Sequence, residues 1–212
     1  MNETGIGRVL VASLHQGIAD LIPTRLEFYE NWLHPAGLRN GKIGLAPLAA
    51  VLSFLRHEGE SYALVTRRAG EYAAEWTAAD RPAIERALIR SLPLPLRARM
   101  VLRMGRRMVR RTYRGSRASV QLRRGSGLMV LRGSIFCGVR APLDHPLCEY
   151  YAAALMRLLA LFGIDGDARV SSCRGAGDAA CLVEITVRGS LQVEELGRVG
   201  RVRTDAVEQE PR

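Results

Sequence analysis

The C-terminal stretch from His145 to Ile185, HPLCEYYAAALMRLLALFGIDGDARVSSCRGAGDAACLVEI, decides the fold. It begins with a helical pattern, which has Pro146 near its start and Gly163 near its end. Two alternating runs typical of strands follow, ARVSSC and ACLVEITV, and a glycine-rich turn joins them. This order predicts a long helix followed by a β-hairpin, and therefore an α+β domain.

Two cysteines, Cys173 and Cys181, flank the turn of this hairpin. A two-residue turn at Gly177-Asp178 would pair Cys173 with Leu182 and place the two thiols on opposite faces. A three-residue loop centred on Gly177 would instead place the two cysteines opposite each other, with Cβ atoms about 5 Å apart. The second register would let both thiolates bind one tetrahedral metal ion, with Zn–S bonds of about 2.3 Å.

A metal site needs further ligands, and the neighbouring sequence offers three. Cys148 opens the long helix, and Cys137 is expected to end a strand, so both lie at element ends that can reach the hairpin. His145 is a further candidate. The alternative is that all four cysteines are structural and buried, as free cysteines often are. A disulfide framework is not expected in a chain of this kind.

The composition predicts one main domain in a chain of 212 residues, of which 48% are hydrophobic. Lys42 is the single lysine among 31 basic residues, so the net charge of +10 is carried almost entirely by arginine. No zinc-finger spacing, RNP-like motif or clear helix-turn-helix accompanies this charge, which argues against a nucleic-acid partner. The first apolar run contains histidine and glutamine and resembles neither a signal peptide nor a spanning helix, so we expect a cytoplasmic protein.

Upstream of the strand-like half, apolar periodicity predicts a series of helices. They cover residues 6–22, 23–33, 45–60 and 63–76, and a further one begins after Asp80-Arg81-Pro82. We expect residues 1–60 to pack as a helical segment on a main domain of residues 61–188. The charged tail, residues 189–212, is expected to be disordered.

A basic amphipathic helix is predicted from Leu96 to Tyr113. Leu96, Met100, Met104 and Met108 recur at four-residue spacing, while arginines occupy the other faces: Arg103, Arg106, Arg107, Arg110 and Arg111. The simplest interpretation is a core-facing stripe with a solvated outer face. Two sharper hypotheses are a methionine lining for a hydrophobic ligand, and an interfacial helix that contacts an anionic membrane or an acidic partner.

The opening stretch resembles the C-terminal signature of the 4-vinyl-reductase-type domain family. In that signature a cysteine opens a long helix, and two more flank a Gly-Asp turn before a final strand. YALVTRRAGEYAAEW is similar to the family's helix with an Arg-Ala-Gly centre. LPLPLRARMVLRMGRRMVRRTYRGS and the HPLC motif are most similar to the auxiliary proteins of bacteriochlorophyll synthesis named after 4-vinyl reductase. The resemblance covers about Tyr62 to Val187.

The resemblance implies a TRAPP-like ligand-binding fold, in which a helical layer packs on a twisted antiparallel sheet and encloses a hydrophobic pocket. Phenol-sensing activators, haem-based nitric-oxide sensors and Golgi-tethering subunits share this fold. In the phenol-sensing members, three cysteines and a glutamate hold a zinc ion. Cys148, Cys173 and Cys181 fall on the cysteine positions, whereas Val170 falls on the glutamate. A complete structural zinc site would therefore need Cys137 or His145 as its fourth ligand.

For function, the resemblance implies an accessory protein that binds a hydrophobic small molecule, a porphyrin or other tetrapyrrole intermediate of bacteriochlorophyll synthesis. We expect the apolar contacts from Met100, Met104 and Met108, and the charged rim from Arg106, Arg107 and Arg110. Pigment-synthesis enzymes, a second copy of the chain as a homodimer, and a peripheral membrane contact are the further partners considered.

Two alternative functions stay open: a divinyl chlorophyllide 4-vinyl reductase, and a lipid- or aromatic-sensing or scaffold domain that acts through a partner protein. The segment RGAGDAA contains G-x-G-x-x-A but leads into a strand instead of a helix, which does not suit dinucleotide binding. We therefore expect a role other than catalysis.

Overall fold

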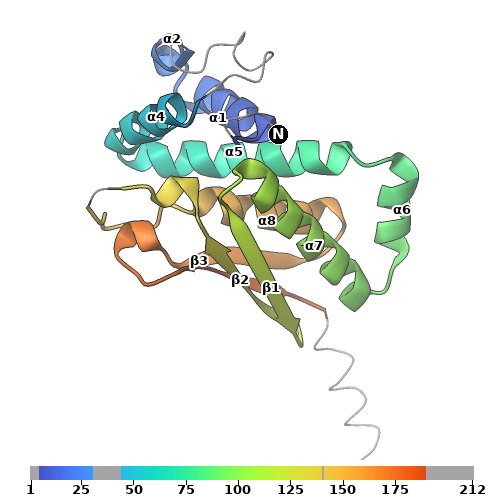
Figure 1. Cartoon of the computed structure of the whole chain (residues 1–212). Helices are drawn as coiled ribbons and strands as arrows, with labels where there is room; N and C mark the ends of the chain where they lie inside the picture. Colours follow the sequence, from blue (N-terminus) through green and yellow to red (C-terminus); the bar gives the residue numbers. More distant parts are fainter. Residues whose placement is uncertain (1–4, 31–43, 140, 190–212) are drawn as a thin grey trace, which may run out of the picture.

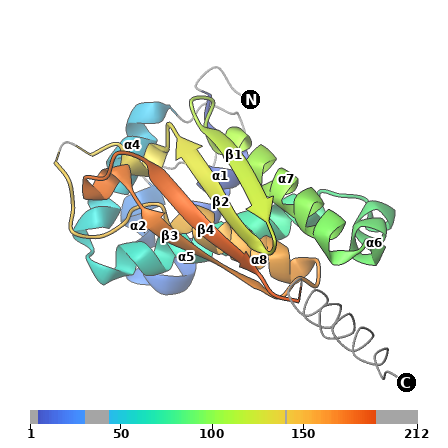
Figure 2. The ribbon, with the colours of Figure 1, turned by 90° about the horizontal axis from the view of Figure 1, so that it is seen from below.

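A computed structural model describes residues 5–30, 44–139 and 141–189. The expected α+β class is confirmed: helices lie in layers over one face of a four-stranded antiparallel sheet (Figure 1). Figure 2 shows the sheet from the side opposite to these helices. Within the described ranges, no helix is long and apolar enough to cross a membrane. The predicted tail lies outside the described residues from position 190 onward, as does the end of the second predicted helix.

The helices begin and end within a few residues of their expected bounds. They are α1 (Arg8–Leu21), α2 (Leu26–Glu30) after a 3-10 turn (Pro23–Arg25), α4 (Leu45–His57), α5 (Glu60–Ala79), α6 (Ala83–Ser91), α7 (Leu94–Thr112) and α8 (Glu149–Leu161). Pro82 and Pro93 directly precede α6 and α7. A proline suits this position because the first N–H groups of a helix have no partner within the helix, and proline has no N–H group.

Helix α5 is the centre of the helical layers, with α1 on one side and α8 on the other (Figure 1). Small residues allow the close approach on both sides. A Cβ atom on Gly17 of α1 would lie 2.9 Å from the carbonyl oxygen of Val65, and one on Gly70 would overlap the backbone of Tyr150 in α8. The Arg-Ala-Gly centre of α5 therefore contributes two small residues, Ala69 and Gly70, to opposite helix contacts.

The sheet has the strand order β1-β2-β4-β3. Its strands are β1 (Arg117–Arg123), β2 (Ser126–Arg132), β3 (Gly166–Ser172) and β4 (Cys181–Val187). Met129 and Val183 pair across the two central strands and are fully buried, and β3 packs against α8. The outer face of β1 carries exposed polar residues at alternate positions, as expected for a strand that is covered on one side.

Of the predictions at the cysteines, the one for Cys137 is wrong and the one for the hairpin holds in its register but not in its loop. Cys137 ends a 3-10 turn (Ile135–Cys137) and not a strand, because the chain leaves β2 at Gly133, which has a φ of +65°. Of the two predicted hairpin registers, the structure has the one that sets Cys173 opposite Cys181, since Ser172 pairs with Leu182 after a β-bulge. The predicted three-residue loop does not form, because the ladder stops at Ser172 and Cys173 lies beyond the end of β3. A second 3-10 turn (Arg174–Ala176) and Gly177, with a φ of +95°, complete the connection to β4.

Helix α7 buries a face rotated from the predicted stripe. Met104 and Met108 are buried, but Leu96 and Met100 are 49% and 36% exposed. The buried face instead follows a three-to-four-residue spacing through Ala98, Val101, Leu102, Gly105, Met108, Val109 and Thr112. This face packs closely on α8: a Cβ atom on Gly105 would lie 2.5 Å from a methyl group of Leu155, and the Leu155 side chain would have to shift to admit it.

Candidate metal centre and adjoining hollows

The four cysteines of the chain come together where the β3–β4 connection meets the start of α8. The Sγ atoms of Cys137, Cys148, Cys173 and Cys181 all lie within 4.8 Å of one another. Cys137 is half-buried and the other three are buried, and all four are free thiols. Cys137 and Cys181 are 44 positions apart in the sequence, so folding of the whole C-terminal half assembles the cluster.

The spacing of the sulfur atoms matches that of a tetrahedral thiolate shell. Cys137 Sγ lies 3.1 Å from Cys148 Sγ and 3.4 Å from the Sγ atoms of both Cys173 and Cys181. The Sγ atoms of Cys148 and Cys173 are 3.7 Å apart. With Zn–S bonds of about 2.3 Å, tetrahedral geometry sets neighbouring sulfurs about 3.8 Å apart, whereas a disulfide needs about 2.0 Å. Four such ligands would fill the shell and leave no open position for a substrate.

Each cysteine is placed by a different local structure. Cys137 closes the 3-10 turn after β2, Cys148 is the N-cap residue of α8, and Cys181 is the first residue of β4. Cys173 is fixed by Asp178, whose Oδ2 accepts a hydrogen bond from the Cys173 backbone N–H at 2.7 Å. The sequence pattern Cys-x-x-x-x-Asp thus folds the connection back on itself and turns the Cys173 side chain toward the cluster.

Hydrogen-bond donors surround the sulfurs as they do in thiolate sites. The backbone N–H of Leu147 donates to Cys173 Sγ, and that of Arg174 donates to Cys181 Sγ, both at 3.3 Å. The Ser134 hydroxyl lies 3.5 Å from Cys148 Sγ. Such outer donors orient metal-bound ligands and spread their negative charge.

Mutual contact shifts the pKa values of the four thiols in opposite directions. Hydrogen bonding with Cys148 is the main cause that lowers the pKa of Cys137 to about 7. Contact with Cys137 lowers the pKa of Cys173 but raises the pKa values of Cys148 and Cys181. Some of the thiols therefore lose their protons easily while the neighbouring thiols keep theirs, because buried thiolates repel one another. A bound divalent cation would remove this conflict.

An open cleft gives an ion a path to the cluster. It has a volume of about 310 Å³ and is lined in part by Ser134, Cys137, Pro142, Arg174 and Cys181. Cys137 and Cys181 are the two cysteines that line it, and the open space beside them would allow a metal ion to reach the cluster after the fold has formed.

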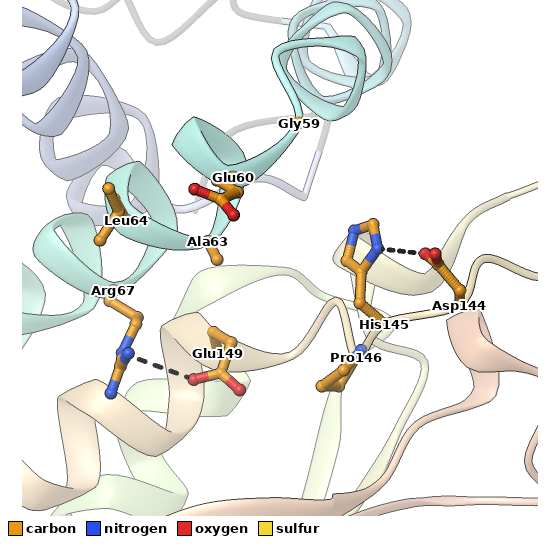
Figure 3. A pocket seen from close by; sticks show the side chains of 9 residues that line it. All are labelled: Gly59, Glu60, Ala63, Leu64, Arg67, Asp144, His145, Pro146 and Glu149. Carbon is orange, nitrogen blue, oxygen red and sulfur yellow. Dashed lines mark hydrogen bonds and ion pairs between the residues drawn. The ribbon is translucent and has the colours of Figure 1, made fainter.

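His145, the other candidate ligand, is not part of the cluster found among the described residues. Its Nδ1 is 2.7 Å from Asp144 Oδ1, and its Nε2 is buried without a hydrogen-bond partner in the described chain. It lines a larger hollow of about 650 Å³ between the starts of α5 and α8. Figure 3 shows His145 and Asp144 at one end of this hollow, and an ion pair between Arg67 and Glu149 at the other, with the closest atoms 3.6 Å apart.

A smaller groove, with a volume of about 270 Å³, lies between α7 and β1. Its lining consists of three arginines and three apolar residues: Arg99, Arg103, Arg106, Leu102, Val120 and Leu122. Arg99 and Arg103 are exposed and form no ion pair with an acid of the described chain, and the Nε atom of Arg106 is buried without a hydrogen-bond partner there. The groove therefore joins an apolar floor to unneutralised positive charge.

The predicted ligand contacts are only partly assembled at this groove. Arg106 lines it, whereas Arg107 and Arg110 lie elsewhere on the outside of α7. Met104 and Met108 belong to the core, and Met100 is exposed without lining the groove. The pattern of α7 alone could not identify Val120 and Leu122, because they come from the neighbouring strand β1.

Comparison with known proteins finds similarity among solved structures. No family model and no curated protein matches the chain. Among solved structures, the chain is similar to the crystal structure of the phenol-responsive sensory domain of the transcription activator PoxR with phenol. The two are 17% identical with a TM-score of 0.46, over 72% of this chain and 80% of that chain.

Proposed function

We propose that this protein is a zinc-stabilised accessory protein that binds an apolar small molecule carrying acidic groups. The zinc part rests on the four Sγ atoms within 4.8 Å of one another, with two backbone N–H groups donating to them. Zinc suits this all-sulfur tetrahedral set, and a filled shell makes its role structural. The metal would join the turn at Cys137, the start of α8 and both ends of the β3–β4 connection.

Metal content and chelator competition test the zinc part. We expect the purified protein to hold one zinc ion, and Cys137→Ser to weaken zinc binding by more than about a hundredfold, beyond the usual effect of an outer-shell change. His145→Ala is the matched control, because His145 lies three positions before Cys148 in the sequence while its side chain is outside the cluster. Equal zinc affinity of Cys137→Ser and the wild type would contradict a four-cysteine site.

The ligand-binding part rests on the groove between α7 and β1. Leu102, Val120 and Leu122 give it an apolar floor, and Arg103 and Arg106 place guanidinium groups beside that floor. Carboxylates form strong, often bidentate hydrogen bonds with arginine, so the groove suits a molecule with an apolar body and acidic groups. The larger hollow in Figure 3 suits such a ligand less, because Glu60 and Asp144 add negative charge to its lining.

A tetrapyrrole intermediate of bacteriochlorophyll synthesis is the ligand we propose within this class. Its macrocycle is flat and apolar and its propionates are acidic, which are the two properties that the groove combines. The resemblance of the α7 segment to auxiliary proteins of that pathway directs the proposal to this pigment. An accessory protein of this kind would hold the intermediate for pigment-synthesis enzymes.

Titration with protoporphyrin IX and with its dimethyl ester tests the ligand. We expect the free acid to bind at least about tenfold more tightly than the ester, since each lost charge-assisted contact is equivalent to about a factor of ten. Arg103→Gln with Arg106→Gln should weaken binding of the acid by a similar factor or more. Arg107→Gln with Arg110→Gln is the matched control, because neither residue lines the groove. Equal affinities of acid and ester would contradict the proposal.

A further inference from the structure

The junction of α6 and α7, residues 83–103, forms a second exposed feature, which we call the elbow. In Figure 1, α6 lies at the outer edge of the molecule, away from α1 and α4. Two arginines hold it in place. Arg90 donates hydrogen bonds from Nε and Nη2 to the carbonyl oxygen of Leu161, at 3.2 and 2.8 Å, and Arg97 donates to the carbonyl oxygen of Arg90 at 3.0 Å. The elbow is thus tied to the end of α8.

Large apolar side chains point into solvent at the elbow. Ile84 and Leu88, one helical turn apart on α6, are 81% and 64% exposed. Leu96 and Met100, one turn apart at the start of α7, are 49% and 36% exposed. Single exposed aliphatic residues are common on proteins, but here two helices in contact with each other each expose a pair, and we call these four residues the apolar tip.

The solvent face of α7 continues from this tip as a row of arginines. Met100, Arg103, Arg107 and Arg110 follow one another at three- or four-residue spacing, so they share a face of the helix. Arg103, Arg107 and Arg110 are exposed, and no acid of the described chain pairs with them. Asp80 and Glu85, the acids near this face in sequence, are already paired with Arg111 and Arg81.

From this arrangement we infer that the elbow docks on an anionic lipid membrane surface. The apolar tip would enter the boundary between headgroups and acyl chains, and the arginine row would contact the lipid phosphates. The inference does not depend on the proposed ligand, because Ile84 and Leu88 lie outside the groove between α7 and β1.

The charge and chemistry of the face favour a membrane over other partners. Two copies of this chain would bring unpaired arginines together and repel each other. Nucleic acid would satisfy the arginines but offers nothing that buries exposed isoleucine and leucine side chains. An anionic bilayer offers both an apolar phase, which could bury the tip, and negatively charged headgroups directly above it, which could bind the arginine row.

Flotation of the full-length protein with lipid vesicles tests the inference. We expect it to bind phosphatidylcholine vesicles that contain about one third phosphatidylglycerol, and not pure phosphatidylcholine vesicles. Ile84→Ser with Leu88→Ser should lower the partition coefficient at least about tenfold, since two buried aliphatic side chains are lost. Leu64→Ser is the matched control, because Leu64 is 55% exposed but lies on α5, at the hollow in Figure 3.

The outcomes separate lipid docking from general attraction between charges. Binding that is weakened by the double variant but unchanged by Leu64→Ser supports the inference. Equal binding of the double variant and the wild type would overturn it, because the arginines alone would then account for the attraction. No binding to anionic vesicles would also overturn it. The porphyrin titration with the double variant keeps this test separate from the proposed function, since the variant should bind porphyrin normally.

Discussion

The cysteine cluster and the elbow place their strongest chemical groups in opposite ways. At the cluster, Cys137, Cys148 and their partners converge, and backbone N–H groups point at the sulfurs. At the elbow, Ile84 and Leu88 face solvent, and the arginine row that continues along α7 has no acidic partner among the described residues. The comparison teaches that groups which stabilise this fold face one another, whereas groups directed outward are available to a second molecule.

The largest effect on stability should come from the cluster. We expect Cys173→Ala to lower the free energy of unfolding by about 4 kcal/mol in zinc-containing buffer, because a four-ligand structural site loses one ligand. Urea unfolding measures this change. Wild-type protein treated with a strong chelator should lose a similar amount, and the variant should no longer respond to the chelator. A variant as stable as the wild type would show that the cluster does not hold the fold together.

A smaller but still large effect should come from the helix contact beside the cluster. Gly70→Ala would drive a methyl group into the backbone of Tyr150, two residues after Cys148, so we expect a loss of about 2–3 kcal/mol in urea unfolding. Gly138→Ala serves as the control, since its Cβ atom would meet its nearest neighbour at 3.6 Å. If both substitutions cost the same, the close approach of α5 and α8 is not what positions the start of α8.

A surface hydrogen-bond network around Asp20 serves as a reference for how much ordinary polar contacts contribute to the free energy of unfolding. Asp20 on α1 accepts hydrogen bonds from Tyr72 at 2.6 Å and from Arg68 at 3.2 Å, and the bond from Tyr72 is the main cause of its lowered pKa. A lowered pKa stabilises the fold above the ordinary value of 3.8, and this contribution is lost as the pH falls below it. Because solvent screens the group, Asp20→Asn should cost less than about 1 kcal/mol at neutral pH.

Urea unfolding of Asp20→Asn and the wild type at neutral pH and at about pH 3 checks the sign. The difference in stability between the two proteins should shrink at the lower pH, because the Asp20 carboxyl group of the unfolded chain takes up a proton there more readily than that of the folded protein. A difference that grows on acidification would contradict the direction of the pKa shift.

The smallest effect on stability is expected at the elbow. Ile84→Ser with Leu88→Ser should change the free energy of unfolding by less than about 1 kcal/mol, since both side chains are exposed and serine is only a slightly poorer helix former. Thermal unfolding is sufficient to measure it. A loss as large as that of Gly70→Ala would mean that these side chains pack within the protein, and would remove the contrast with the cluster.

Much of the fold could be predicted because its signals are local. Apolar periodicity and the proline before α6 gave helix bounds close to those observed, and alternation gave the two strands of the C-terminal hairpin. The buried face of α7 was harder, because two candidate stripes differ by a small rotation of the helix. The buried face is the one on which Gly105 packs closely against Leu155, and this contact could not be predicted without knowing the position of α8.

The candidate site could be predicted in its members but not in its geometry. Free cysteines near element ends pointed to a cluster, and the register that sets Cys173 opposite Cys181 is present where Ser172 pairs with Leu182, but the predicted three-residue loop did not form. The bulge before Ser172 and the hydrogen bond from Cys173 N–H to Asp178 replaced a tight turn, and both depend on pairing with β4. The groove could not be predicted from the sequence for a similar reason, since its lining combines residues of α7 with residues of β1.

The position of α8 between α5 and the sheet has a consequence for how the chain is made. During synthesis from the N-terminus, α1 and α5 emerge long before residues 149–161, so the face of α5 that receives α8 stays without its partner. The last cysteine, Cys181, emerges later still. A nascent chain arrested before this point would expose the apolar face of α5 that α8 later covers.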